Sequence, residues 1–310
     1  MSSVPQSGDS PRGFAYALAA YFIWGFLPLY MKMLAHVPTL EVLAHRVVWS
    51  VPVALAILAW LGRTGDLRKA VGNRRMLAMA GVTALLVSLN WGIYVYAIQS
   101  GQVLEAALGY YINPLFSIFL GRVLLGERLD GLQWAAVLLA VAAVAVLTLE
   151  TGRLPVVALA LTLTWGFYAY FKKSLPIGPN QGFALEVLLL LPLALGYVIW
   201  LAVRGQAMFL QGAAADDLLL IGCGVITAVP LMIYANGAKL LRLSTIGILQ
   251  YIAPTMIFLT AVFWFGEPFG SARAVAFPMI WGALVLYTVA LIRKAGGKAQ
   301  AGQGRRPPGA

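Results

Sequence analysis

The stretch LEAALGYYINPL at residues 104–115 decides how this chain folds, because a related stretch follows it 140 residues later. Tyr251 stands where Tyr111 stands, and Pro254 stands where Pro114 stands. Both stretches lie inside long apolar runs. A proline at the same depth of two apolar runs indicates an internal repeat rather than a chance match.

The repeat extends outward from these prolines to most of the chain. The matches lie 141 residues apart in the early part and 140 in the later part: Trp24-Gly25-Phe26 with Trp165-Gly166-Phe167, Lys32 with Lys173, Tyr94 with Tyr234, and Gly126-Glu127 with Gly266-Glu267. Each copy is long enough for five membrane spans. An odd number of spans inserts the second copy upside down, which is the pattern of alternating-access transporters.

Composition places the chain in a membrane. Its 310 residues are 61% hydrophobic and 11% charged, with a mean hydropathy of +0.84. A span needs about 20 mostly apolar residues. We therefore predict an all-α integral membrane protein with ten transmembrane helices in two inverted five-helix repeats. The predicted spans are residues 13–33, 41–61, 76–98, 104–125, 131–149, 154–173, 182–203, 218–238, 244–265 and 273–293.

Four regions follow from these spans. We predict a cytoplasmic N-terminal tail at residues 1–12, a first repeat at 13–149 and a second at 154–293. Residues 294–310 are rich in Gly, Pro, Lys and Arg, and this composition predicts a disordered basic tail.

The net charge of +11 is explained by topology. Seventeen of the 22 Lys and Arg residues fall on the side that holds both termini, and only Lys32, Arg153, Arg204 and Arg273 fall on the other. This bias predicts a multi-pass protein of the cytoplasmic membrane with both termini in the cytoplasm. The expected partners are the lipid bilayer and a small solute, with no nucleic acid.

Several further stretches, taken in order, carry a family resemblance. They are AAYFIWG (19–25), HRVVWS (45–50), NW (90–91), LEAALGYYINPL (104–115), LGER (125–128), LRLST (241–245) and QYI (250–252). Together they resemble the RarD group of the EamA-type transporters, in the drug/metabolite transporter superfamily. The resemblance covers about residues 13–293. It implies a permease or exporter of small organic solutes, in a group named for a link to chloramphenicol sensitivity.

Polar residues inside the spans are candidates for function, because a charge at mid-membrane costs about 2.5–3.5 kcal/mol on insertion scales. Glu41, His45 and Trp49 share one face of the second span. Arg46 lies beside that face, and it either binds a polar or anionic solute or pairs with Glu41 or Glu105. His45 is either a hydrogen-bonded structural residue or a pH sensor.

A stripe of small and polar residues follows the fourth span at every fourth position: Glu105, Gly109, Asn113, Ser117 and Gly121. Small residues let a neighbouring helix approach closely. Proline frees the carbonyl four residues before it. We therefore predict hinges at Pro114 and Pro254 with a solute site beside them at the repeat interface, although two plain packing kinks would give the same pattern.

Two acids are candidates for proton coupling, namely Glu105 and Glu186. Burial raises the pKa of a carboxyl group and a nearby Arg lowers it, so an acid that alternates between such environments can carry a proton. The alternative is that both are fixed counter-ions. Glu41 and His45 complete the predicted set of charge partners.

The predicted substrate-binding set joins polar and aromatic residues at mid-span, since aromatic faces suit flat solutes or cations. It comprises Arg46, Asn90, Tyr94, Tyr111, Asn113, Tyr234, Gln250 and Tyr251. Each aromatic residue has packing as its alternative role.

We predict a secondary transporter, moving a small organic solute or drug-like metabolite by alternating access and coupled or not to protons. The alternative is an intramembrane enzyme acting on a lipid-linked substrate, with Glu41, His45, Arg46 and Glu105 as an acid–base group. The sequence has no phosphate-binding loop. It holds one cysteine and two histidines, too few for a metal-ligand cluster. We therefore expect no enzyme activity, no cofactor and no metal.

Overall fold

The computed structural model describes residues 10–126, 128–238, 240–241 and 243–303, and the part of the chain that it describes contains helices and no strand. The first half holds α1 (Pro11–Met33), α2 (Thr39–Trp60), α3 (Thr64–Val71), α4 (Arg74–Gln99), α5 (Val103–Leu125) and α6 (Gly131–Thr151). The second half holds α7 (Val156–Ser174), α8 (Pro179–Val203), α9 (Ala214–Ala238), α10 (Leu243–Leu249), α11 (Ile252–Leu259), the π-helical η1 (Thr260–Trp264) and α12 (Ser271–Gln303).

The predicted spans and these helices agree to within a few residues. Within the described residues, nine segments are long and apolar enough to cross a membrane, which makes this an all-α membrane protein. The predicted span at 154–173 coincides with α7, which is not among the nine. Two threonines and a closing pair of lysines make α7 more polar than its neighbours. The tenth span therefore remains a prediction.

Three features differ from the sequence-based prediction. Helix α3 was not predicted. The predicted ninth span is interrupted at residues 250–251, between α10 and α11, whereas α5 continues through Pro114. Helix α12 continues to Gln303, so residues 294–303, predicted to be disordered, are helical. The reason is that extending an existing helix is easier than starting one, and that the Ala, Lys and Gln residues of this segment favour helix while its three glycines disfavour it.

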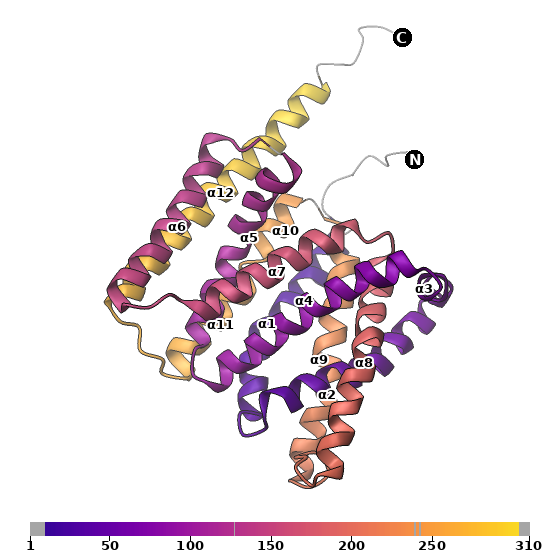
Figure 1. Ribbon diagram of the computed structural model, residues 1–310. Helices are drawn as coiled ribbons and strands as arrows, with labels where there is room; N and C mark the ends of the chain where they lie inside the picture. The colour runs from indigo at the N-terminus through magenta and orange to yellow at the C-terminus, as the bar shows by residue number, and fades with distance from the viewer. Residues whose placement is uncertain (1–9, 127, 239, 242, 304–310) are drawn as a thin grey trace, which may run out of the picture.

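The helices pair reciprocally between the two halves. Helix α1 packs on α9 and α7 on α4, while α1 also packs on α11 and α7 on α5. Helices α2 and α8 pack on each other, and so do α6 and α12, which stand beside the main group of helices in Figure 1. Exchanging α1 for α7, α2 for α8, α4 for α9, α5 for α11 and α6 for α12 leaves this pairing unchanged.

The same reciprocity holds for individual residues. Gly25 on α1 lies so close to Met256 on α11 that a Cβ atom there would clash with its side chain. Gly166 on α7 lies equally close to Phe116 on α5. Gly25 and Gly166 are one pair of repeat-related residues, and Phe116 and Met256 are another, 140 positions apart. A glycine of the first half thus packs against a large side chain of the second half, and the same contact recurs with the two halves exchanged.

Two carboxylates, one from a loop and one from a helix, cap the starts of other helices at the end that holds the loops after α1, α4 and α6. Glu267 accepts hydrogen bonds from the backbone N–H groups of Val103 and Leu104, at the start of α5. Glu105 accepts one from Val157, at the start of α7, at 3.2 Å. The first N–H groups of a helix have no partner within the helix, and they carry partial positive charge. These carboxylates therefore fix α5 and α7 at that end.

Candidate functional site

A cavity of about 150 Å³ lies at the centre of the molecule, between the two halves. Helices α1, α2, α4, α5, α7, α9 and α11 surround it, together with Gln250 in the break between α10 and α11. It is lined by Tyr21, Trp24, Leu27, Arg46, Asn90, Trp91, Tyr94, Tyr110, Asn113, Trp165, Thr227, Leu231, Tyr234, Gln250, Ala253, Pro254 and Ile257. Most of its wall is apolar, with a few polar groups, which is the usual make-up of a small-molecule site.

A second, larger cavity of about 790 Å³ continues from the first. The two share Trp24, Trp165, Leu231, Tyr234 and Gln250, which form the boundary between them. The larger cavity is bordered by Lys172 and Lys173 at the end of α7, and by the start of α8 and the end of α9. The central cavity is therefore approached from the end of the molecule that holds these lysines.

The opposite end is closed by packed side chains. Met31 of α1, Leu34 in the turn after it, Ile98 of α4 and Ala261 of η1 have no exposed surface, and Leu104 of α5 is 1% exposed. All belong to one hydrophobic cluster. The structure thus has an open end and a closed end, on either side of the central cavity.

Arg46 brings a buried charge to the central cavity. Its side chain is 3% exposed. Its Nε donates to the Thr227 hydroxyl at 3.1 Å, and its guanidinium lies 4.9 Å from the centre of the Trp91 ring. These contacts hold the group in place and leave its Nη1 atom with no hydrogen-bond partner.

Two more groups in the cavity wall lack hydrogen-bond partners, the Tyr94 hydroxyl and the Asn113 Oδ1 atom. Asn90 differs, because it donates to the Leu161 carbonyl and accepts from Tyr110. Buried polar groups in native proteins nearly always have partners. Three unpartnered groups at one cavity therefore mark a place where a polar ligand would complete the wall.

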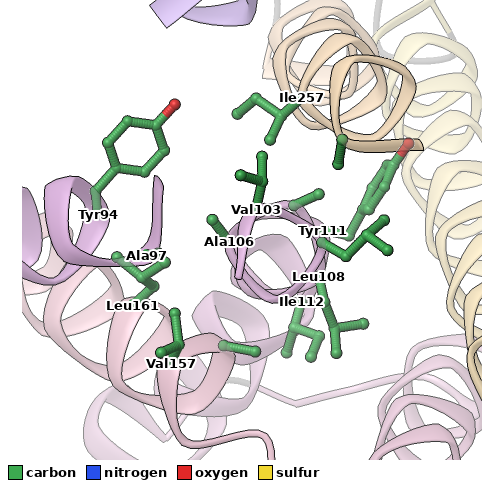
Figure 2. Close-up of a cluster of buried hydrophobic side chains, with 14 of the residues drawn as sticks. Tyr94, Ala97, Val103, Ala106, Leu108, Tyr111, Ile112, Val157, Leu161 and Ile257 are labelled. Atoms are coloured by element: carbon green, nitrogen blue, oxygen red, sulfur yellow. The ribbon is translucent and has the colours of Figure 1, made fainter. Parts of the chain in front are cut away.

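Two tyrosines of the predicted site, Tyr94 of α4 and Tyr111 of α5, lie on different sides of α5. Figure 2 shows α5 nearly end-on, with Tyr94 on one side of it and Tyr111 on the other. The Tyr111 hydroxyl lies 2.8 Å from that of Thr255 on α11, and its ring packs on Phe277 and Trp281. Tyr111 is thus part of a packed cluster, away from both cavities.

The predicted substrate-binding residues therefore fall into two groups. Six of them line the central cavity: Arg46, Asn90, Tyr94, Asn113, Tyr234 and Gln250. Tyr111 and Tyr251 line neither cavity. Pro254 borders the central cavity and Pro114 the larger one. The sequence analysis did not select Tyr21, Thr227 and Leu231, which also line the central cavity. Thr227 and Leu231 lie in no quoted motif, and Tyr21 lies in AAYFIWG (19–25), which was used only for the family resemblance.

The predicted charge partners lie outside the central cavity and bind different groups. Glu41 accepts from the backbone N–H groups of Met208 and Phe209, at 2.7 and 3.2 Å. His45 accepts from the Trp49 indole N–H at 3.1 Å and packs on the Phe209 ring. With Glu105 bound to the start of α7, these side chains do not gather around Arg46.

Glu186 forms a buried ion pair. Its carboxylate has no exposed surface, and it lies 2.6 Å from the Lys172 ammonium and accepts a hydrogen bond from Tyr168 at 3.3 Å. Lys172 and Tyr168 both border the larger cavity. Glu186 is therefore the predicted coupling residue whose partners adjoin the cavities.

Comparisons with known proteins agree with this architecture. Residues 11–149 match the model of the EamA-like transporter family. An "Uncharacterized transporter" of Vibrio cholerae is 43% identical, over 93% of this chain and 96% of that protein. "Protein RarD" of Escherichia coli is 38% identical, over 90% of this chain and 94% of that protein. A solved crystal structure aligns with a TM-score of 0.59 over 91% of this chain and 98% of that one, at 21% identity.

Apolar helices around a central cavity that carries a few polar groups, with transporters as relatives, define this protein as a membrane transporter. The extent and identity of the matches place it more closely: the chain belongs to the EamA-like transporter family, as a member of the RarD type.

Proposed function

We propose that this protein is a secondary transporter, which moves a small organic solute across the cytoplasmic membrane by alternating access. In this proposal α7 is the tenth span, the halves are inverted repeats, and both termini are cytoplasmic. The observation that carries the proposal is the pair of joined cavities, open at one end of the molecule and closed at the other.

The open end is the cytoplasmic end in this proposal, because Lys172 and Lys173 lie there and cytoplasmic ends are rich in basic residues. The structure then corresponds to a state that faces inward. Rocking of the two halves about the central cavity would close this end and open the other. The reciprocal glycine contacts support this movement, since each half presents the same surface to the other.

The break between α10 and α11 is the proposed hinge. Gln250 and Pro254, on either side of Tyr251, both border the central cavity. Proline cannot donate a backbone hydrogen bond, so the carbonyl of Gln250 loses its helical partner. Interrupted helices at mid-membrane are common in transporters, where the freed backbone groups bind solute. Proton coupling, if present, is assigned to Glu186, whose partner Lys172 adjoins the larger cavity.

The proposal is tested by solute flux into liposomes that contain the purified protein. The panel holds amino acids, aromatic metabolites and chloramphenicol, the last because a relative from Pseudomonas aeruginosa is called "Chloramphenicol-sensitive protein RarD". Ala253→Phe fills the central cavity, whereas Ala56→Phe adds the same ring at an exposed position of α2. We expect saturable flux for the wild type and Ala56→Phe, and at least a tenfold loss for folded Ala253→Phe. Equal flux through both variants would contradict the proposed route.

A further inference from the structure

Arg46 is a buried cation without a buried anion beside it. Its contacts in the structure are the Thr227 hydroxyl and the Trp91 ring, both neutral. No Asp or Glu is among the described residues that line either cavity. A charged side chain inside a membrane normally pairs with another group or lines a pathway. The guanidinium therefore has capacity for an anion that the protein itself does not supply.

The groups around Arg46 favour a carboxylate as that anion. Nη1 of Arg46 is a free donor, and the Tyr94 hydroxyl is a second one at the same cavity. A guanidinium has planar N–H donors that match the two oxygens of a carboxylate. The remaining free atom, Asn113 Oδ1, is an acceptor suited to a hydroxyl or amino group on the same molecule. All three residues are less than one-tenth exposed.

The rest of the cavity suits an apolar ring. Tyr21, Trp24, Trp91, Trp165 and Tyr234 line it, and aromatic rings pack well against flat solutes. The volume of about 150 Å³ is of the order of a cavity that holds benzene. An organic cation would also fit by size, but its charge would lie close to that of Arg46 with no acid to offset it.

We propose that the solute is an organic carboxylate with a ring-sized apolar body, bound through its carboxylate to Arg46 and Tyr94. This inference rests on the transporter function proposed above, since it names the substrate class of the same cavity. The carboxylate neutralises the charge of Arg46, and the aromatic wall encloses the body.

The test is calorimetric binding to the purified protein, using three probes of similar size: phenylacetate, phenylacetamide and phenethylamine. A hydrogen bond to a charged group contributes about 1.5–3 kcal/mol, or roughly tenfold to one-hundredfold in affinity. We expect phenylacetate to bind at least tenfold more tightly than the amide, and the amine to bind weakest. Equal affinity for acid and amide, preference for the amine, or binding of none of the three would overturn the inference.

Two matched tyrosine variants locate the carboxylate. Tyr94→Phe removes an unpartnered hydroxyl and leaves the ring, so we expect a several-fold loss of phenylacetate affinity in a stable protein. Tyr111→Phe removes a hydroxyl that is bonded to Thr255, away from the cavity, so its affinity should match the wild type. Arg46→Gln should abolish the preference for the acid over the amide. An unchanged preference in folded Arg46→Gln, or equal losses in both tyrosine variants, would refute the assignment.

Flux measurements separate this inference from the function on which it rests. A protein that binds phenylacetate through Arg46 but moves no solute would contradict the transporter proposal and leave the carboxylate site intact. A protein that moves neutral or cationic solutes through the cavity, and rejects phenylacetate, would support transport and refute the inference.

Discussion

A single methyl group at Gly224 tests whether the contact between α2 and α9 positions the site. A Cβ atom at Gly224 would lie well under 3.0 Å from the carbonyl group of Trp49 and close to its Cβ atom. These are mainly backbone atoms, so no side-chain rotation relieves the clash and the helices must separate. Trp49 lies one turn after Arg46, and Gly224 lies one turn before Thr227. The separation therefore lengthens the 3.1 Å bond that fixes the guanidinium.

The magnitude of the effect follows from two opposing terms. Overpacking a tight contact costs about 1–3 kcal/mol, and a backbone clash belongs at the upper end of this range. Replacing Gly by Ala inside a helix contributes about 1 kcal/mol in the other direction. We therefore expect Gly224→Ala to lower the free energy of unfolding by about 2 kcal/mol. Gly196→Ala is the matched control, because Gly196 lies within α8 with no other group within 4 Å of the added methyl.

The assay is reversible unfolding of both variants and the wild type in mixed detergent micelles, followed by binding of phenylacetate. Gly196→Ala should be as stable as the wild type or up to about 1 kcal/mol more stable. Gly224→Ala should be less stable, and it should bind the probe more weakly because Arg46 has moved. If Gly224→Ala proves as stable as Gly196→Ala, the close α2–α9 contact and its role in placing Arg46 are refuted.

Three further variants test other parts of the structure. Glu186→Gln leaves Lys172 in place without its counter-charge, and removing one partner of a buried ion pair should cost about 3–5 kcal/mol of unfolding free energy; the double variant with Lys172→Met should recover most of this loss. Burial raises the pKa of Glu267, in the loop before α12, above its usual value, so the folded protein holds this proton more tightly than the unfolded chain. The contribution of Glu267 to the free energy of unfolding should therefore be largest at low pH and be lost as the pH rises through the raised pKa. Glu267→Gln should abolish this pH dependence in unfolding measurements from about pH 4 to pH 8. Gly166→Ala should destabilise the protein through its clash with Phe116, and adding Phe116→Leu should restore stability, whereas no recovery would argue against that contact.

The spans could be predicted from the sequence because each is a long apolar run that must cover the same thickness of membrane. Helix α3 was missed because its eight residues form no such run. Hinges were predicted at Pro114 and Pro254 alike because proline signals a lost donor, and only packing decides whether the helix bends, breaks or continues. Pro114 lies within a continuous α5, while the region around Pro254 is interrupted.

The lining of the central cavity was predicted in part, for a reason that lies in α5. Most of this helix is buried, and its stripe of small and polar residues meets α7 at Glu105 and Gly109 but the cavity at Asn113, so the stripe does not show which side faces the cavity. Tyr110 and Tyr111 are adjacent in sequence and alike in chemistry, yet only Tyr110 lines the cavity. The repeat pointed to Tyr111, because it has a counterpart at Tyr251. A repeat identifies equivalent positions, and those positions can serve packing as well as binding.

The buried charge was the more reliable guide to the lining of the central cavity. Arg46 was selected because a charge in a span is costly, and it lies in the cavity wall with a free Nη1 atom. The acids selected by the same argument were instead bound to backbone N–H groups or to Lys172. Sequence gives the cost of burying such a group, and only the fold shows what compensates for it.

Alternating access is tested most directly by labelling single cysteines from each side of the membrane. Cys223, which is fully buried, is first replaced by Ala. Ala235→Cys then reports on the larger cavity, and Ile257→Cys, at a 2% exposed residue of the central cavity, reports on the closed end. We predict that an impermeant thiol reagent labels Ala235→Cys from the cytoplasmic side. It should label Ile257→Cys from the outside only while the transported solute is present. Labelling of both positions to the same extent with and without the solute would contradict the account.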